Sequence, residues 1–195
     1  MRFFKIKYKE SSDEELMNLL SKGDKKAFDE IYQRYSGILM GYFFKMLWQN
    51  KEKAEDMVHE LFIKIIRKPA YFDPQRSFKT WVFSVACNMC KNEYKKAEVR
   101  KKSSNDLDMI VPQISSENVF NQVQDMQFKE AFETAFQKLE LKHREVFALR
   151  HFEGLSIKEI AEAVDANEGT IKSRLFYATK QMAVQLKIFK TELTI

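Results

Sequence analysis

The sequence predicts an all-α protein with two helical domains. The 195-residue chain contains only 5 Gly and 3 Pro, too few to supply the turns of a many-stranded sheet. Two Ser-x-x-Glu capping boxes, which start at Ser12 and Ser156, each mark the beginning of a helix. Apolar residues recur at the spacing of one helix face along most of the chain, which favours long helices.

The first predicted domain spans residues 11–102 and contains four helices. Ser12 caps a short helix that Gly23 ends, and Asp24 caps a second, longer helix. A third helix runs from about residue 51 to 67, before a proline that prevents smooth continuation. We expect this third helix to bury one stripe of side chains, made of Ala54, Met57 or Val58, Leu61, Ile65 and Ile66.

A loop with two prolines and three aromatic residues leads into the fourth helix, from about residue 77 to 102. The face expected to pack against the domain carries Phe78, Trp81, Val82, Val85, Ala86 and Met89. The opposite face is expected to carry Thr80, Ser84, Cys87, Lys91 and Lys95. Aromatic rings beside lysines suit single-stranded nucleic acid, because each ring stacked on an unpaired base contributes about 1 to 3 kcal/mol. For Tyr71 and Phe72 in the loop, base stacking and core packing are both open.

Residues 103–122 are polar, lack lysine and arginine and include a proline, so they predict a flexible linker. The second predicted domain, residues 123–190, begins with two amphipathic helices and ends in a helix, a tight turn and a helix. Ser156 begins the first helix of this pair, and Asn167 caps the second. This order is that of a helix-turn-helix, whose second helix enters the major groove of DNA.

The second helix of the pair has two distinct faces. Its inner face is made of Ile171, Leu175, Ala178 and Met182. Phe176 and Tyr177 point outward beside basic residues, an arrangement that a buried hairpin would not show. The contacts we assign are phosphates or guanine edges for Lys172 and Arg174, a base or phosphate for Ser173, and thymine methyls or sugars for Phe176 and Tyr177. The alternative is an ordinary helical hairpin inside an all-α protein.

Composition narrows the class of function. The net charge of +5 and the pI near 9.0 favour a polyanionic partner over an acidic small substrate. Cys87 and Cys90 are the only cysteines, which excludes a disulfide framework and favours a reducing compartment, and no histidine has zinc-site spacing to them. No signal peptide is recognised, and the longest apolar run is too short to span a bilayer, so we expect a cytoplasmic protein.

No catalytic constellation emerges from the sequence. A nucleophile, a base and an orienting acid do not occur together in any recognisable motif, and no glycine-rich phosphate loop is present. We therefore expect neither an enzyme nor a small-molecule substrate, and no cofactor or metal.

Four motifs in order give the chain a family resemblance. AEDMVHELFIK (residues 54–64) and SFKTWVFSVACN (77–88) resemble region two of extracytoplasmic-function (ECF) sigma factors, the compact sigma subunits of bacterial RNA polymerase. EGLSIKEIA (153–161) and GTIKSRL (169–175) are similar to region four of the same family. The resemblance implies a subunit that binds core RNA polymerase and directs it to promoter DNA by reading −35 and −10 elements.

The resemblance also implies roles for particular residues. The surface implied to bind core polymerase comprises Asp56, His59, Glu60 and Phe62, where His59 replaces the glutamine most usual in the family. The residues implied to recognise and open the −10 element are Tyr71, Phe72, Arg76, Asn88, Lys91, Asn92 and Lys95. Those implied for the −35 element are Thr170, Lys172, Ser173, Arg174, Phe176 and Tyr177.

The sequence also bears on how the protein is regulated and on which other functions are possible. Because no sensor domain is recognised, the resemblance predicts an anti-sigma factor with a membrane anchor, which covers the surface around Asp56, Glu60 and Phe62 or wedges between the domains. One alternative is a self-sufficient helix-turn-helix regulator, which would bind palindromic DNA without polymerase. A second alternative is an anti-terminator or another RNA-binding adaptor.

Overall fold

The computed structural model describes residues 7–103 and 122–187 of the chain. These residues form eight α-helices and two short 3-10 helices, with no strand among them, so the all-α prediction is confirmed. The chain divides into two compact units, Met1–Asp106 and Leu107–Ile195. The predicted linker, residues 103–122, lies almost wholly outside the described residues.

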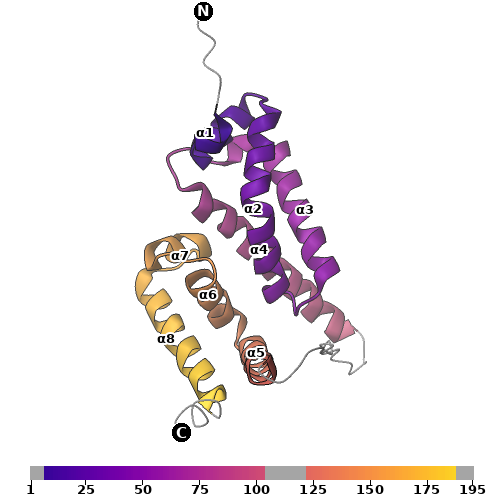
Figure 1. Cartoon of the computed structure of the whole chain (residues 1–195), viewed down its shortest axis with the longest axis vertical. Helices are drawn as coiled ribbons and strands as arrows, with labels where there is room; N and C mark the ends of the chain where they lie inside the picture. Colours follow the sequence, from indigo (N-terminus) through magenta and orange to yellow (C-terminus); the bar gives the residue numbers. More distant parts are fainter. Residues whose placement is uncertain (1–6, 104–121, 188–195) are drawn as a thin grey trace, which may run out of the picture. The chain divides into compact units, whose positions relative to one another are not determined.

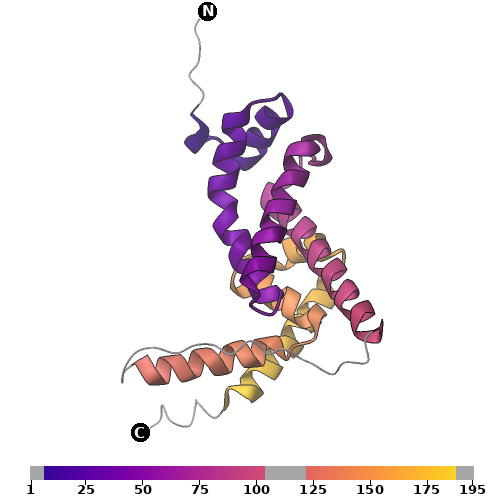
Figure 2. The same ribbon diagram turned by 90° about the vertical axis from the view of Figure 1, so that its right-hand side faces the viewer.

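The first unit is a bundle built around two long antiparallel helices. Its elements are η1 (Tyr8–Glu10), α1 (Asp13–Ser21), α2 (Lys25–Met46), α3 (Lys51–Arg67), η2 (Pro69–Tyr71) and α4 (Phe78–Ser103). In Figures 1 and 2, α2 and α3 lie side by side, and α4 packs against both. The Ser12 capping box and the Asp24 cap form as predicted: Ser12 Oγ accepts from Glu15 N at 3.1 Å and Asp24 Oδ1 accepts from Lys26 N at 2.9 Å.

The first half of α4 is buried on more sides than predicted. Thr80 and Cys87, expected on its solvent face, are fully buried, and the Cys87 thiol lies 3.2 Å from the hydroxyl of Tyr42 on α2. Helix α4 contacts α1, α2 and α3, so one amphipathic stripe cannot describe it. The start of the helix is held by α1, because the Glu14 carboxylate accepts from Phe78 N at 2.8 Å.

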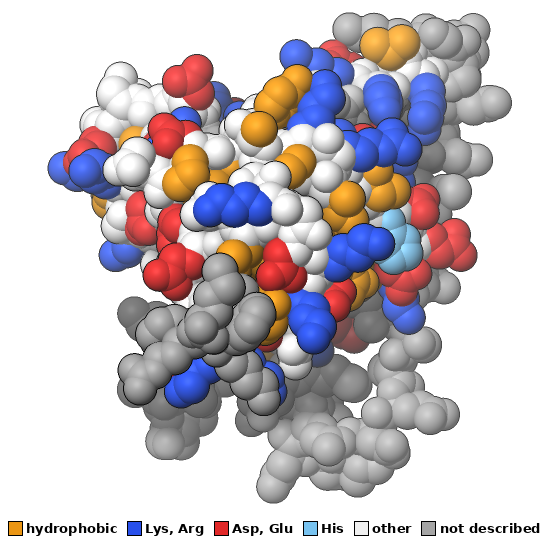
Figure 3. Space-filling model, turned by 90° about the horizontal axis from the view of Figure 1, so that it is seen from above, with side chains coloured by type: hydrophobic (Ala, Val, Ile, Leu, Met, Phe, Trp, Pro, Cys, Tyr) orange, Lys and Arg blue, Asp and Glu red, His pale blue; other side chains and the backbone are white. Residues whose placement is uncertain are grey.

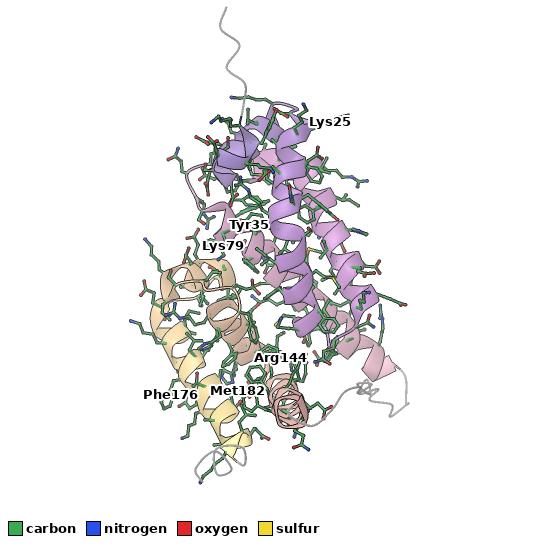
Figure 4. All side chains as sticks on the ribbon, viewed as in Figure 1. Lys25, Tyr35, Lys79, Arg144, Phe176 and Met182 are labelled. Atoms are coloured by element: carbon green, nitrogen blue, oxygen red, sulfur yellow. The ribbon has the colours of Figure 1, made fainter. Side chains whose placement is uncertain are left out.

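Arg34 ties the N-terminal segment to α2. Its guanidinium donates to the carbonyls of Tyr8, Lys9 and Ser11 at 3.0 to 3.1 Å, and to the Asp13 carboxylate at 2.7 Å. Tyr35 (Figure 4), one residue further along α2, hydrogen-bonds the same carboxylate, and its burial raises the pKa of its hydroxyl. These bonds join the segment before α1 to α2, so they fix where the chain enters α1.

The second unit contains α5 (Gln122–Gln137), α6 (Leu141–His151), α7 (Ile157–Val164) and α8 (Glu168–Gln185). Helix α8 packs against the other three. Ser156 forms its predicted capping box with Glu159, and Asn167 Oδ1 accepts from Thr170 N at 2.8 Å. Between these helices Asp165 adopts a left-handed conformation, with φ of 55°, which ends α7 and reverses the chain. The predicted helix-turn-helix is therefore present.

Two features hold this second unit together. Phe136, Phe147 and Phe152 form an aromatic cluster, with ring centroids 5.5 to 6.1 Å apart. The buried guanidinium of Arg144 donates to the side-chain oxygen of Gln137 at 3.0 Å and to the carbonyl of Leu139 at 2.9 Å. Arg144 thus satisfies backbone and side-chain oxygens where α5 turns into α6.

Candidate functional site

The outer face of α8 exposes two aromatic rings. Phe176 is 62% exposed and Tyr177 is 50% exposed, while Ile171, Ala178 and Met182 of the same helix are buried. Figure 4 shows Phe176 on the outer side of α8, with Met182 on the side that faces α5. The predicted inner face is confirmed for Ile171, Ala178 and Met182, whereas Leu175 is half-buried and reaches the surface beside Phe176. The outer face exposes the two aromatic rings to solvent, as predicted.

Two shallow depressions flank this pair of rings. One is lined by Phe176 with Ile157, Lys172, Leu175, Thr179, Lys180 and Ala183, and its walls are mostly apolar. The other is lined by Tyr177 with Lys142, His143, Asn167, Gly169, Thr170, Ser173 and Arg174, and it is more polar. Lys172 and Arg174 thus lie on opposite flanks, where they can approach different stretches of a nucleic-acid backbone.

Of the three aromatic residues in the predicted loop, Phe78 begins α4 and only one of the other two is exposed. Tyr71 is 69% exposed, and Lys68 Nζ donates to its hydroxyl at 2.9 Å. Phe72, by contrast, is only 4% exposed, and its ring packs 5.5 Å from Phe78 and 5.4 Å from Trp81. Of the two roles left open for Phe72, the structure shows core packing, so its place among the residues implied to contact the −10 element is wrong. Its ring anchors the loop to α4, because the neighbouring rings offer more apolar contact than solvent does.

The rest of the loop and the exposed side of α4 carry the remaining polar candidates. A turn closes where Arg76 N donates to the carbonyl of Asp73 at 3.0 Å, and it leaves the Arg76 side chain at the surface. Further along α4, Asn88, Asn92 and Lys95 are exposed and Lys91 is half-buried. These four positions recur every three or four residues, so they share one strip of the helix surface.

The candidate polymerase surface on α3 differs from the prediction in its apolar residue. Asp56, His59 and Glu60 are exposed. Phe62 is only 3% exposed, with its ring 4.7 Å from Tyr32 and 5.9 Å from Phe28 of α2. The prediction that Phe62 lies on this surface is wrong, because α2 covers its side of α3.

Two isoleucines supply the apolar contact area that Phe62 does not. Ile63 is 47% exposed and Ile66, predicted to be buried, is 48% exposed. Both continue the strip that begins at Asp56, since positions 56, 59, 63 and 66 share one face of a helix. The sequence alone does not separate these positions, because Phe62 and Ile66 each follow a buried residue by one position, yet Phe62 is buried and Ile66 is exposed.

Charge on the surface is mixed in sign. Seen from above in Figure 3, acidic and basic side chains both reach the surface, with apolar side chains exposed between them. On α3 the ammonium of Lys64 lies 2.8 Å from the carboxylate of Glu60, and this hydrogen bond lowers the pKa of the Glu60 carboxyl. In the described residues, no helix combines the length and apolar character needed to cross a bilayer.

The fold and the exposed face of α8 define a DNA-binding protein of the helix-turn-helix class. Residues 31–100 match the family model of sigma-70 region 2, and residues 129–182 match that of sigma-70 region 4. The chain is 30% identical to the ECF RNA polymerase sigma-E factor of Escherichia coli over 175 residues, which cover 86% of this chain and 90% of the relative. The chain belongs to the ECF family of RNA polymerase sigma factors, and it directs the initiation of transcription at promoters.

Other relatives agree with this membership. The ECF RNA polymerase sigma-E factor of Haemophilus influenzae is 29% identical, over 88% of this chain and 93% of the relative. Among solved structures, CnrH in complex with the cytosolic domain of CnrY has a TM-score of 0.67 at 18% identity, over 91% of this chain and 99% of that one. The sigma factor RpoE of Bartonella quintana, in complex with the anti-sigma factor NepR, has a TM-score of 0.68 at 21% identity, over 84% and 98%. These structures share the fold.

Proposed function

We propose that the two units divide the work of promoter recognition. The first, predicted to span residues 11–102, binds core polymerase and opens the −10 element, and the second, predicted to span residues 123–190, reads the −35 element. The observation that carries this proposal is the exposed pair Phe176 and Tyr177 on a capped second helix, in a chain that also matches region 2. The sigma family accounts for both units, whereas a self-sufficient regulator or an RNA-binding adaptor would leave the region 2 match unexplained.

The α3 strip is the surface we assign to core polymerase. Asp56, His59 and Glu60 offer a polar rim beside the half-exposed side chains of Ile63 and Ile66. Apolar area surrounded by charges is the usual anatomy of a protein interface. Burial of the two isoleucine side chains against polymerase would contribute favourable free energy to binding. The carboxylates of Asp56 and Glu60 favour a basic surface on the partner.

The loop before α4 and the exposed strip of that helix are assigned to the −10 element. Tyr71 offers an exposed ring, held at one edge by Lys68, on which an unpaired base can stack. Phe72, Phe78 and Trp81 fix the loop beneath it. Asn88 and Asn92 can hydrogen-bond base edges, while Arg76, Lys91 and Lys95 contact the backbone.

The exposed face of α8 is assigned to the −35 element. Thr170 and Ser173 lie near its N-terminal end, where a recognition helix meets base edges. Phe176 and Tyr177 contact thymine methyls or sugars, and Lys172 and Arg174 contact phosphates on the two flanks. Neither unit needs to bind tightly alone, because polymerase holds both and converts the second contact into an intramolecular one.

This proposed role implies where the protein acts and what it contributes to RNA synthesis. The protein acts in the cytoplasm, where core polymerase and the chromosome are found, and contributes no catalytic group of its own to RNA synthesis. Unstacking a base costs a few kcal/mol, which the contacts to the flipped base offset.

A protein inhibitor is the regulatory partner we propose. Two solved sigma-fold structures are complexes with another protein, one of them the anti-sigma factor NepR. An inhibitor of this kind, membrane-anchored in our prediction, would cover Asp56, Glu60 and Ile63 or wedge between the units. Capture of the protein from uninduced cells should recover a stoichiometric inhibitor; recovery of fully active protein with polymerase alone would contradict this.

Selection from a promoter library tests the division of labour. Core polymerase is combined with the protein and a library randomised at both elements, and the bound and melted DNA is sequenced. We expect one −35 and one −10 motif at fixed spacing, with variants of α8 changing only the former. A palindromic motif, or selection by the protein without polymerase, would support the self-sufficient regulator instead.

A further inference from the structure

A polar depression at the start of α8 has the character of an anion site. Lys142 and His143 come to it from α6, while Gly169, Thr170 and Arg174 come from the first two turns of α8. Lys142 is exposed and Arg174 is half-buried, so two cations flank the opening. The depression joins residues from two helices that are distant in sequence and includes His143, which no motif had singled out.

His143 is a buried polar group with unused hydrogen-bonding capacity. Its side chain is only 8% exposed, and within the described part of the chain its Nδ1 has no hydrogen-bond partner. Its ring lies 6.2 Å from the ring of Tyr177, and both residues line the depression. A buried donor or acceptor without a hydrogen bond lowers stability by about 1 to 3 kcal/mol, so such a group usually bonds to a ligand or to water.

The backbone of α8 favours an anion at the same place. The first N–H groups of a helix have no intrahelical acceptor and carry partial positive charge. Asn167 takes the N–H of Thr170, which leaves the earlier amides for a ligand. Gly169 has no side chain to crowd this end of the helix. A Cβ at this position would lie 3.3 Å from the capping oxygen of Asn167.

We propose that this depression binds one phosphate of the DNA backbone beside the −35 element, and that His143 contributes a proton-dependent hydrogen bond to it. The inference rests on the proposed function of α8 and deepens it. χ2 of histidine is roughly two-fold, so a half-turn of the ring exchanges Nδ1 with Cδ2 and presents a nitrogen to the ligand without moving the backbone.

The charges around His143 set the direction of its proton linkage. In the free protein burial lowers the pKa of His143, and Lys142 and Arg174 lower it further, while Glu140 opposes them. Glu140 is itself paired with Lys142 at 2.8 Å, and Glu168 adds a negative charge to the first turn of α8. A phosphate would favour the imidazolium, so binding should take up a proton and strengthen as pH falls from 7.5 to 6.

The test pairs a protein change with a DNA change. Reconstituted holoenzyme carrying His143→Gln, or the native chain, is titrated with promoter duplexes in which single phosphates beside the −35 element are replaced by neutral methylphosphonates. At one position the replacement should weaken the native complex roughly tenfold and the variant far less, because both changes remove the same bond. His151→Gln is the matched control, since His151 lies on the same helix but outside the depression.

Additive losses at every phosphate, in a holoenzyme that still selects its −35 sequence, would overturn the inference and leave the proposed function standing. If the native holoenzyme selects no −35 sequence, the proposed function itself is overturned. If His143→Gln fails to fold, NMR titration of the native His143 ring replaces it. A pKa that rises on promoter binding supports the site, and an unchanged pKa contradicts it.

Discussion

Phe176 and Tyr177 are neighbours in the chain but line opposite flanks of α8. Their ring centroids are 5.5 Å apart with the planes at 75°, so the edge of one ring meets the face of the other. Phe176 borders the apolar depression and Tyr177 the polar one beside His143. The pair forms a ridge between two flanks, with Lys172 on the side of Phe176 and Arg174 on the side of Tyr177, an arrangement that suits the proposed insertion of α8 between two DNA backbones.

Substitutions on this ridge should separate specificity from affinity. Replacing Phe176 or Tyr177 by Ala should change the preferred −35 sequence, because each good base contact discriminates by about 1 to 3 kcal/mol. Replacing Arg174 by Ala should weaken all sequences alike and reduce the salt dependence of binding. Val184→Ala, at another exposed position of α8, is the control. An unchanged −35 preference in both aromatic variants would remove the ridge from recognition.

The α3 strip should bind core polymerase without supporting the fold. Asp56→Ala and Ile63→Ala should weaken association with core polymerase and leave the thermal midpoint near that of the native chain. Phe62→Ala should instead cost about 3 to 5 kcal/mol of unfolding free energy, because it opens a cavity beside Tyr32. Val99→Ala, a truncation at an exposed aliphatic residue of α4, controls for lost apolar area. Native affinity in both folded α3 variants would contradict the assignment.

Promoter opening should depend on Tyr71 and Asn88, whereas binding of the protein to core polymerase should not depend on them. With Tyr71→Ala or Asn88→Ala, the holoenzyme should assemble normally and bind the −35 element, while permanganate reactivity of the −10 thymines falls. Phe72→Ala should lower stability as well as melting, since Phe72 supports the loop from below. Unchanged thymine reactivity in the Tyr71 and Asn88 variants would place melting elsewhere.

Stability of the second unit should fall at mildly acidic pH. Burial lowers the pKa of His143 and of His151 in the folded chain, so the unfolded state binds protons more readily. The unfolding free energy is therefore greatest well above pH 6.5, the ordinary pKa of histidine. It decreases as pH falls below that value toward the lower pKa of the folded chain. Denaturant titrations between pH 7.5 and 5 should show this decline, and the double variant His143→Gln, His151→Gln should flatten it. A decline of equal slope in both proteins would assign it to other groups.

Local rules predicted the helix-turn-helix in detail because its signals lie within a few residues of each other. The capping box at Ser156 and the cap at Asn167 each join atoms three residues apart, so the sequence alone contains both partners. The same reasoning succeeded at Ser12 and Asp24.

Positions decided by distant partners could not be predicted in this way. Phe62 and Ile66 occupy one helix at boundary positions, and only the path of α2 determines which of them is covered. Phe72 is buried because Trp81 and Phe78 lie under the loop. His143 enters the candidate site because α6 packs across the start of α8, a contact between segments far apart in sequence.

Transcription by reconstituted polymerase tests whether the protein directs initiation at promoters. Core RNA polymerase, with and without the protein, is given a promoter from the library selection and labelled nucleotides, and the 5′ ends of the transcripts are mapped. We expect a single start downstream of the −10 element only when the protein is present, and we expect this start to be lost when Asp56→Ala and Ile63→Ala are combined. Specific starts by core alone, or none when the folded native protein is added, would contradict it.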